Sequence, residues 1–245
     1  MNTKVVKMKD INFDESLFIP MQTGKVVDNL LSGTGGLMKG CNFAFVGDPG
    51  VGKSTVLLDI LADLQKNGSN VLFVSGEMNA IDMYGYVKRF PKFGNLPILF
   101  MGDHLDSDPL QVLESTFKKG FDTVLVDSMA EIVTVVSDYH RCTNKQAETM
   151  ILNLYEKHNL ANNDTNTHTT FMIIQQVTKT GNFAGSNRFK HMLTGMCHMI
   201  FESEDQRLMF FSKNRRGSKT RRLYFDLGAG GSVTWIHPDS VTTEA

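Results

Sequence analysis

The sequence predicts an α/β fold in which a twisted, mainly parallel β-sheet is flanked by helices and extended by antiparallel strands toward the C-terminus. From residue 42 to residue 176, apolar runs rich in β-forming residues alternate with segments of helical periodicity, the pattern of parallel strands joined by helical crossovers. From residue 197 onward, short strand-like runs follow one another with only turns between them, which indicates an antiparallel meander.

The first α/β unit covers residues 42–68. The run NFAFVG (Asn42–Gly47) is apolar and is predicted to form a buried strand. The segment KSTVLLDILADLQKNG, which follows shortly after, has apolar residues at helical spacing and reaches Gly68, a residue type that commonly ends helices.

The alternation continues to residue 176. Further buried strands are predicted in NVLFVSGE (Asn70–Glu77), LPILFMGD, FDTVLVDS (Phe121–Ser128) and TTFMIIQQ (Thr169–Gln176). Helices are predicted in NAIDMYGYVKRF, in DPLQVLESTFKKG, which opens with an Asp-Pro start, and in NKQAETMILNLYEKHN. The expected C-terminal strands are CHMIFES, RLMFFSKN, RRLYFDL and SVTWIH.

Length and composition indicate one ordinary globular domain. The chain has 245 residues, of which 41% are hydrophobic and 21% charged, and chains of roughly 200–250 residues are often single domains. We expect residues 1–20 to form an N-terminal arm outside the core, available for contact between subunits, and residues 21–245 to form the domain. The net charge of -1 excludes a generally basic nucleic-acid coat but leaves room for a local basic surface.

The sequence also favours a cytoplasmic location without a membrane partner. No apolar run reaches the roughly 18 residues that span a bilayer, and the start, MNTKVVKMKDINFDES, lacks an apolar signal core. Cys41, Cys142 and Cys197 are scattered and show no C-x-x-C spacing, which indicates a reducing compartment and argues against a zinc site.

A complete phosphate-binding motif follows the first strand. GDPGVGKS matches G-x-x-x-x-G-K-[ST] and lies between a predicted strand and a predicted helix, the context that this motif requires. Backbone N–H groups of the glycine-rich turn and the helix N-terminus would cradle phosphate oxygens, Lys53 would reach the β- and γ-phosphates, and the Ser54 hydroxyl would ligate Mg²⁺. The predicted ATP site comprises Gly47, Asp48, Pro49, Gly50, Val51, Gly52, Lys53, Ser54 and Thr55.

Polar residues end three other predicted strands, and ligands of open parallel sheets bind at such carboxyl ends. Asp127 ends TVLVD and is expected to act with Ser54 on Mg²⁺ as a Walker B acid; its alternative role is a helix N-cap. Glu77 ends VLFVSGE and can deprotonate the attacking water, unless it is only a surface acid. Gln175 and Gln176 end FMIIQQ, where an amide can hydrogen-bond the γ-phosphate and the loop that follows, or serve structure alone.

These segments, in this order, resemble the RecA superfamily and most closely the bacterial RadA (Sms) group, with DnaB-type replicative helicases as more distant relatives. The segment QQVTKTGNFAGSNRFKHM resembles the stretch in which V-T-K-x-G begins a DNA-binding loop, and KNRRG resembles the K-N-R-F-G motif. The sequence departs from the family at Arg216, where the family carries Phe, and at Gln176, where RadA carries His.

The resemblance gives a role to the basic run SKNRRGSKTRR (Ser212–Arg222). In rings and filaments of this superfamily, a lysine and an arginine reach the γ-phosphate that a neighbouring subunit holds, and Lys213 and Arg215 match those positions. Alternation along a strand would point both cations to one side and Asn214 to the other. The resemblance therefore implies a head-to-tail ring or filament, with a hexamer as the expected assembly.

The loop after Gln176 is the expected contact with single-stranded DNA. Lys179, Arg188 and Lys190 could neutralise phosphates there, and Phe183 and Phe189 could stack on bases, if they do not face the core. A second candidate is residues 137–146, which resembles the family's other pore-facing loop only in position. Arg89 could touch the adenine base or form a surface salt bridge.

The sequence thus predicts an Mg²⁺-dependent ATPase that moves along or remodels single-stranded DNA, as a helicase or branch-migration motor of recombination or replication. The alternative is a RecA-like regulatory or nucleic-acid-packaging ATPase that is not a DNA helicase. Stimulation of ATP hydrolysis by DNA would separate the two.

Overall fold

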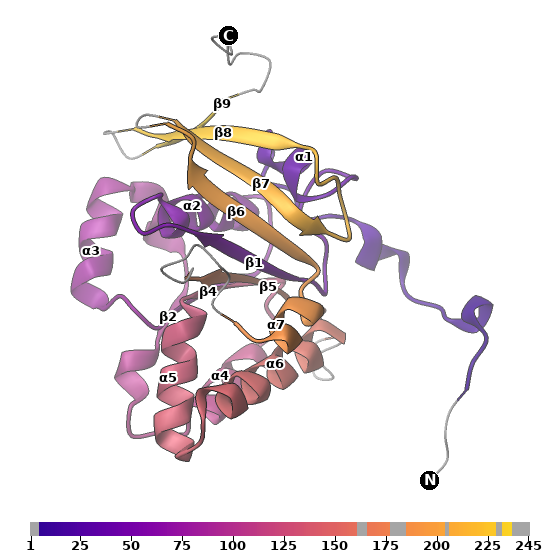
Figure 1. Ribbon diagram of the computed structural model, residues 1–245, viewed down its shortest axis with the longest axis vertical. Coiled ribbons are helices and arrows are strands. Elements are labelled where there is room, and N and C mark those ends of the chain that lie inside the picture. The colour runs from indigo at the N-terminus through magenta and orange to yellow at the C-terminus, as the bar shows by residue number, and fades with distance from the viewer. Residues whose placement is uncertain (1–4, 161–165, 177–184, 204–205, 229–231, 237–245) are drawn as a thin grey trace.

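A mixed β-sheet runs through the centre of the protein (Figure 1). The computed structural model describes residues 5–160, 166–176, 185–203, 206–228 and 232–236. Within them the sheet has nine strands in the order β3-β2-β4-β5-β1-β6-β7-β8-β9. The strand bounds are β1 Asn42–Gly47, β2 Val71–Ser75, β3 Ile98–Phe100, β4 Thr123–Asp127, β5 Thr170–Gln175, β6 Gly195–Phe201, β7 Arg207–Asn214, β8 Arg222–Leu227 and β9 Val233–Ile236.

The predicted division into a parallel and an antiparallel part is confirmed. Strands β3, β2, β4, β5, β1 and β6 are parallel neighbours, whereas β7, β8 and β9 continue the sheet in antiparallel order. The boundary lies one strand later than the run of short strands indicates, because β6 pairs in parallel with β1, with Phe43 opposite Gly195. The segment before β6 contains helix α7 (Asn187–Met192) and so makes a crossover rather than a hairpin.

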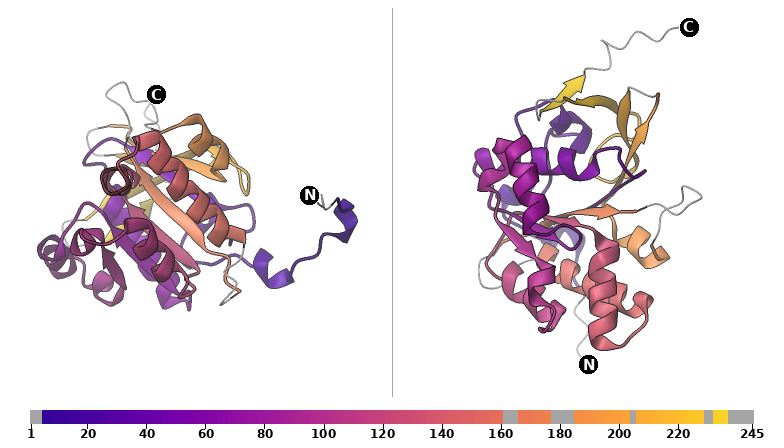
Figure 2. Two further views of the ribbon diagram at one scale, coloured as in Figure 1. Left: turned by 90° about the horizontal axis from the view of Figure 1, so that it is seen from below. Right: turned by 90° about the vertical axis from the view of Figure 1, so that its left-hand side faces the viewer.

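Helices cover both faces of the sheet (Figures 1 and 2). Their bounds are α1 Val27–Leu31, α2 Lys53–Lys66, α3 Ala80–Arg89, α4 Pro109–Phe117, α5 Met129–His140 and α6 Asn144–Leu160. The sequence pattern does not predict α5, because its β-branched IVTVV stretch has modest helix propensity. Tertiary packing decides its structure, since Ile132, Val133 and Val136 are buried against the sheet.

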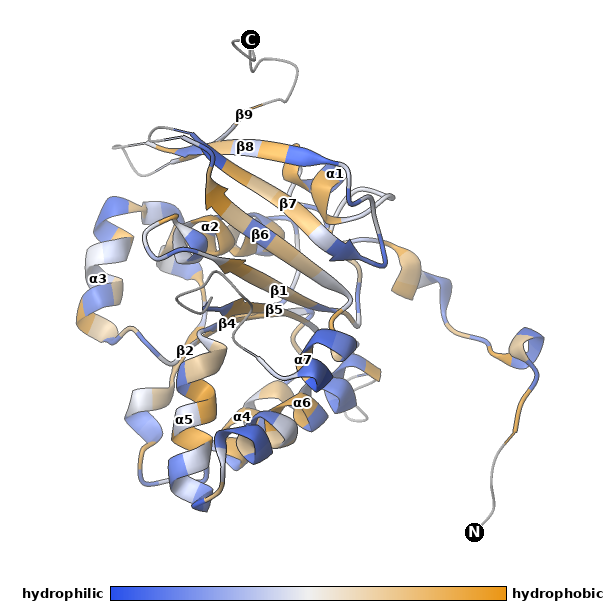
Figure 3. Ribbon diagram, in the orientation of Figure 1, coloured by the Kyte–Doolittle hydropathy of each residue, from blue (hydrophilic) through white to orange (hydrophobic). Residues whose placement is uncertain are grey.

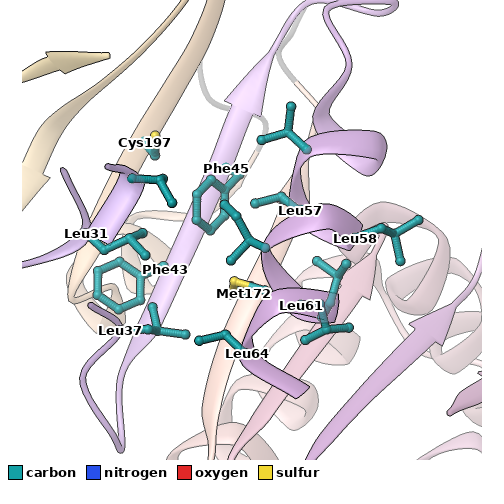
Figure 4. Packing of buried hydrophobic residues seen from close by; sticks show 14 of the residues in the cluster. Leu31, Leu37, Phe43, Phe45, Leu57, Leu58, Leu61, Leu64, Met172 and Cys197 are labelled. Atoms are coloured by element: carbon teal, nitrogen blue, oxygen red, sulfur yellow. The ribbon is translucent and has the colours of Figure 1, made fainter. Parts of the chain in front are cut away.

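The strands supply alternate side chains to two hydrophobic clusters. Phe43 and Phe45 of β1 pack with α1 and α2 on one face, where Figure 4 shows them beside Leu57, Leu61 and Met172. Ala44, between the two phenylalanines, belongs to the cluster under α4, α5 and α6. Strands β1, β2, β4 and β5 are buried along their full length and carry the apolar colour in Figure 3, as strands covered on both faces must.

Helix α2 is buried along most of its length. Every residue from 55 to 64 is at most 8% exposed. Two of these residues are acids, Asp59 and Asp63. Lys25 Nζ lies 3.0 and 2.7 Å from their carboxylates, and Lys92 Nζ lies 2.6 and 2.8 Å from them. Burial alone would lower the pKa of Lys25, but the hydrogen bonds to the two acids raise it overall. The four charges therefore neutralise one another and join α2 to two other segments of the chain.

The N-terminal segment projects from this body (Figure 1). Its two short 3₁₀-helices, Met8–Asp10 and Glu15–Phe18, contain no buried residue, whereas Met21 is buried and exchanges two backbone hydrogen bonds with Leu37. The use of residues 1–20 as an inter-subunit arm remains a prediction. No helix in the described parts of the chain combines the length and the apolar character needed to cross a membrane.

Candidate functional site

The turn between β1 and α2 forms the cradle at the carboxyl end of the parallel strands. Gly52 has φ of 98° and precedes the first residue of α2, a conformation that side chains rarely adopt. Gly47 is required for a different reason, since a Cβ there would lie 2.0 Å from the carbonyl oxygen of Met199 on β6. The backbone of the turn can therefore take this shape only with glycine at these positions.

Lys53 turns back into the cradle. Its Nζ donates to the carbonyl oxygens of Gly47, at 2.8 Å, and Asp48, at 2.9 Å. Burial lowers the pKa of Lys53, while the charges of Asp127, Asp48 and Glu77 oppose that shift. The ammonium group of Lys53 therefore lies inside the turn, where nearby carboxylates favour its charged form.

Ser54 and Asp127 meet beside the cradle. The Ser54 hydroxyl donates to Asp127 Oδ2 at 2.5 Å, and Asp127 is 2% exposed. Burial, reinforced by the charge of Glu77, raises the pKa of Asp127 to about 6, against the effects of the Ser54 hydrogen bond and the Lys53 charge. Asp127 is not the N-cap of α5, because that position is Ser128; the peptide bond between the two residues is cis.

Glu77 and Gln176 line the same cleft, which has a volume of about 520 Å³. Each follows the end of its strand, Glu77 two residues after β2 and Gln176 directly after β5. Both are exposed, whereas Gln175 is buried. The structure therefore brings Lys53, Ser54, Asp127, Glu77 and Gln176 together at one end of the sheet.

Five further residues form the far wall of the cleft, and of these the sequence indicates only Arg89. They are Tyr86, Arg89 and Phe90 of the α3 region and Arg207 and Leu227 of the antiparallel strands. The rings of Tyr86 and Phe90 stack with centroids 6.0 Å apart, and the Arg89 guanidinium lies 5.1 Å from the Phe90 ring centre. The spacing of Tyr86, Arg89 and Phe90 at i, i+3 and i+4 was an available signal, since such residues share one helix face.

Lys213 and Arg215 lie at the opposite end of the sheet. The register places Asn214 opposite Gly195, at the start of β6, and the Arg215 N–H donates to the Thr194 carbonyl at 2.9 Å. Lys213 Nζ donates to the carbonyl of Lys190 at 2.6 Å, and Arg215 Nη2 donates to that of His191 at 3.2 Å. These carbonyls belong to the last turn of α7, so the structure does not bring the two cations to the cradle of their own chain.

The rest of the basic run docks on the α1 side. Asn214 is buried with its amide donating to the Leu31 carbonyl at 3.1 Å, opposite in direction to Lys213 and Arg215 as the alternation predicts. The carbonyl of Arg216 accepts from Gly33 N–H at 2.8 Å, and Arg221 donates to the Asn29 carbonyl. The hairpin is thus attached to the body rather than fully solvated.

The candidate DNA residues are only partly described. Lys179 and Phe183 lie outside the described residues. Arg188 and Lys190 are exposed on α7, and Arg188 donates to Asn153 Oδ1 at 2.5 Å on α6. The expectation that Phe189 is available to stack on bases is wrong, because it is fully buried in the core.

The second candidate loop, residues 137–146, is not an open loop. It contains the last turn of α5, a left-handed Arg141 with φ of 50°, and the first residues of α6. The Cys142 N–H donates to the Ser137 carbonyl at 3.0 Å, which closes a tight helix-helix connection.

The chain is similar in sequence to DNA repair proteins named RadA. The RadA of Campylobacter jejuni is 30% identical over 204 residues, which cover 82% of this chain and 43% of that protein. The RadA of Streptococcus pyogenes serotype M6 is 29% identical over 250 residues, which cover 99% and 51%. The chain thus spans about half the length of the curated relatives it matches. No family model matches the chain.

Solved structures share the fold at lower identity. A KaiC-like protein, PH0186, of Pyrococcus horikoshii has a TM-score of 0.68 and 16% identity, with 89% of this chain and 99% of that chain covered. The flagellar accessory protein FlaH of Methanocaldococcus jannaschii has a TM-score of 0.64 and 12% identity, with 89% and 100% covered. The resemblance that the sequence motifs indicate is therefore confirmed: the chain is a relative of the RadA proteins and has a RecA-like α/β fold.

Proposed function

We propose that this protein hydrolyses ATP with Mg²⁺ and couples hydrolysis to movement along, or remodelling of, single-stranded DNA in recombination or replication. The observation that supports hydrolysis is the single cleft in which a glycine-rich cradle, a lysine, a buried Asp-Ser pair and an exposed glutamate converge. The similarity to DNA repair proteins supports DNA as the partner.

The residues of the cleft divide the chemistry of phosphoryl transfer. Backbone N–H groups of the cradle and Lys53 bind the β- and γ-phosphates. Glu77 orients a water molecule and accepts its proton as the water oxygen attacks the γ-phosphorus and the bond to ADP breaks. Gln176 hydrogen-bonds the γ-phosphate and lies at the start of the candidate DNA loop, so it would report the state of the nucleotide to that loop.

The Ser54–Asp127 pair fits Mg²⁺. Both residues present oxygen atoms, the ligands that this ion prefers. The two oxygens lie 2.5 Å apart, so both are close to the position that one ion would occupy. A buried carboxylate whose pKa is raised to about 6 lacks a full countercharge, which a divalent cation supplies. When bound, the ion neutralises charge on the phosphates.

We further propose that subunits assemble head to tail, as a ring or filament and most simply a hexamer, with Lys213 and Arg215 acting on the ATP of the neighbour. The two cations lie at the end of the sheet opposite the cleft. They can therefore reach a bound nucleotide only in the cleft of another chain. The charges are complementary, because exposed Asp48 and Glu77 flank the cleft while Lys213 and Arg215 mark the opposite end.

The alternative function is a RecA-like regulatory or packaging ATPase that is not a DNA helicase. The fold similarity to a KaiC-like protein and to a flagellar accessory protein favours it as much as the motor. The deciding experiment is the rate of ATP hydrolysis with and without single-stranded DNA. Stimulation supports the motor, whereas an unchanged rate supports a regulator and preference for RNA supports packaging.

We expect Lys53→Ala to abolish ATP hydrolysis and Glu77→Gln to retain ATP binding while lowering turnover by roughly 10²–10⁴-fold, because an amide cannot accept the water proton. Nucleotide binding and steady-state phosphate release measure the two effects. Lys66→Ala, at the exposed end of the same helix, is the control and should behave like wild type. Loss of ATP binding in Glu77→Gln would exclude Glu77 as the base.

We expect Asp127→Asn to stabilise the nucleotide-free protein at neutral pH. Since the pKa of Asp127 rises to about 6 on folding, the stability linked to its neutral form is complete below about pH 4 and is lost as the pH rises through about 6. The difference in unfolding free energy between variant and wild type should therefore grow between pH 4 and pH 7.5, by on the order of 3 kcal/mol. Asp106→Asn, at an exposed acid, should show no such trend in denaturant titrations.

We expect two inactive variants to rescue each other. Lys53→Ala has a damaged cradle but an intact Lys213–Arg215 pair, and Arg215→Ala has the reverse. In a randomly mixed equimolar assembly, about one quarter of the head-to-tail interfaces pair an intact cradle with an intact arginine. ATPase activity should return and peak near equal ratios, whereas mixing Lys53→Ala with the Lys53→Ala/Arg215→Ala double variant should give none. Inactive mixtures that demonstrably co-assemble would refute action in trans.

We expect alanine at Lys179, Arg188 and Lys190 together to weaken single-stranded DNA binding without lowering basal ATPase activity. Each lost phosphate contact should reduce the slope of log affinity against log salt by about 0.7, hence by about 2 for three contacts. Fluorescence anisotropy at several salt concentrations measures this slope. A triple variant of the exposed Lys66, Lys118 and Lys119 is the control, and an equal effect in both would reject the loop as the contact.

A further inference from the structure

The part of the cleft wall formed by Tyr86, Arg89 and Phe90 belongs to a segment that α3 itself does not anchor. Tyr86 and Arg89 lie on α3, which contains no buried residue, and Phe90 follows it directly. Because the cradle takes the phosphates, the ribose and base of a bound nucleotide extend along the rest of the cleft. A flat purine ring stacks well on aromatic side chains, and Tyr86 and Phe90 offer that contact. The position of this wall relative to the cradle therefore decides whether one nucleotide can reach both.

The residues after α3 attach this wall to the core. Phe90 and Phe93 are both 3% exposed, and their rings stack with centroids 5.0 Å apart and an interplanar angle of 11°. Both belong to the hydrophobic cluster around α2. Apolar packing is favourable but not directional, so it keeps the two rings in the core without fixing how the segment is oriented around them.

Lys92, between the two phenylalanines, makes directional contacts with α2. Its Nζ donates to the Asp59 carboxylate at 2.6 Å and to the Asp59 carbonyl at 3.0 Å, and it lies 2.8 Å from the Asp63 carboxylate. Hydrogen bonds between charged groups are roughly twice as strong as those between neutral groups. Gln65 adds a second contact from α2, since its Nε2 donates to the Asn95 carbonyl at 3.0 Å.

Helix α2 also carries the cradle. It begins at Lys53, and Asp59 and Asp63 lie about 9 and 15 Å further along its axis. The two acids stand at i and i+4, so they share one face of the helix. Because α2 is closely packed inside the protein, its N-terminus and its middle keep a fixed separation. A contact with Asp59 and Asp63 therefore fixes a position relative to the cradle.

We propose that Lys92 is a positioning residue for nucleotide binding, which keeps the wall of Tyr86 and Phe90 at the distance from the cradle that one nucleotide spans. This inference rests on the proposed binding of ATP in the cleft. It gives different roles to the two lysines that contact Asp59 and Asp63. Lys25 attaches the segment before α1, which does not line the cleft in the described part of the chain, whereas Lys92 attaches the wall.

Comparison of a non-hydrolysable ATP analogue, adenylyl imidodiphosphate, with inorganic tripolyphosphate tests this role. Both offer phosphates to the cradle, but tripolyphosphate has no base. In Lys92→Met with Mg²⁺ present, isothermal titration calorimetry should show a Kd for the analogue about tenfold above that of wild type. The Kd for tripolyphosphate should stay within about twofold of wild type.

Steady-state kinetics and a conservative variant give independent readouts. KM for ATP should rise in Lys92→Met by about the same factor as the Kd, with kcat within about twofold, because the substitution leaves Lys53, Asp127 and Glu77 in place. Lys92→Arg keeps the charge and should restore most of the affinity for the analogue.

Lys25→Met is the matched control. The side chains of Lys25 and Lys92 are 33% and 34% exposed and contact the same two carboxylates, so either substitution leaves the acids with one cation. Both variants should lose similar stability in denaturant titrations, but only Lys92→Met should change the ratio of the two Kd values. Gln65→Ala leaves all four charges in place, so it keeps the inference testable should Lys92→Met fail to fold. It should shift the ratio in the same direction by about threefold.

The outcomes separate this inference from the proposed function. Equal loss of analogue and tripolyphosphate binding in Lys92→Met would overturn it, since Lys92 would then serve stability alone, and so would an equal change of the ratio in Lys25→Met. If wild-type protein binds the analogue no more tightly than tripolyphosphate, the wall takes no base and the inference is wrong while the cradle stands. If wild-type protein binds neither compound, the proposed nucleotide site is wrong as well.

Discussion

The connection between β1 and α2 is the constraint on which the rest of the structure depends. A fully buried strand passes through a glycine-rich turn into a helix buried from residue 55 to residue 64. Neither element can shift without disturbing both the sheet and the cluster around Phe43 and Phe45. The packing of the strand before the turn and of the helix after it therefore fixes the backbone conformation of the turn, which does not depend on a bound ligand.

Much of the fold could be predicted because its strongest signals are local. Buried strands such as Asn42–Gly47 and Thr123–Asp127 are continuous apolar runs, and the cradle is a contiguous motif, so Lys53, Ser54 and Asp127 could be identified without knowledge of tertiary contacts. The parallel pairing of β6 with β1 could not, since it depends on a crossover whose path is not encoded in the strand itself.

The parts that escaped prediction are those that depend on distant contacts. Arg207 on β7 and Leu227 on β8 line the cleft only because these strands extend the sheet beyond β6, and nothing in their neighbouring sequence marks them. For Phe189 the sequence leaves open whether the ring stacks on bases or faces the core, and the choice depends on which side of the short helix α7 packs against the body. The sequence around Lys25 and Lys92 likewise gives no sign that these lysines neutralise the two acids inside α2.

The hydrogen bonds of Lys213 and Arg215 to the end of α7 bear on the strength of the proposed contact between subunits. In the single chain these cations already have carbonyl acceptors at 2.6 and 3.2 Å. Approach to a neighbour's phosphate would therefore exchange one set of acceptors for another instead of satisfying empty donors, so the net gain from closure is smaller than the contacts suggest. In the head-to-tail assembly proposed above, a contact made by exchanging acceptors would contribute less binding free energy than one that satisfies empty donors, so the interface would open more easily.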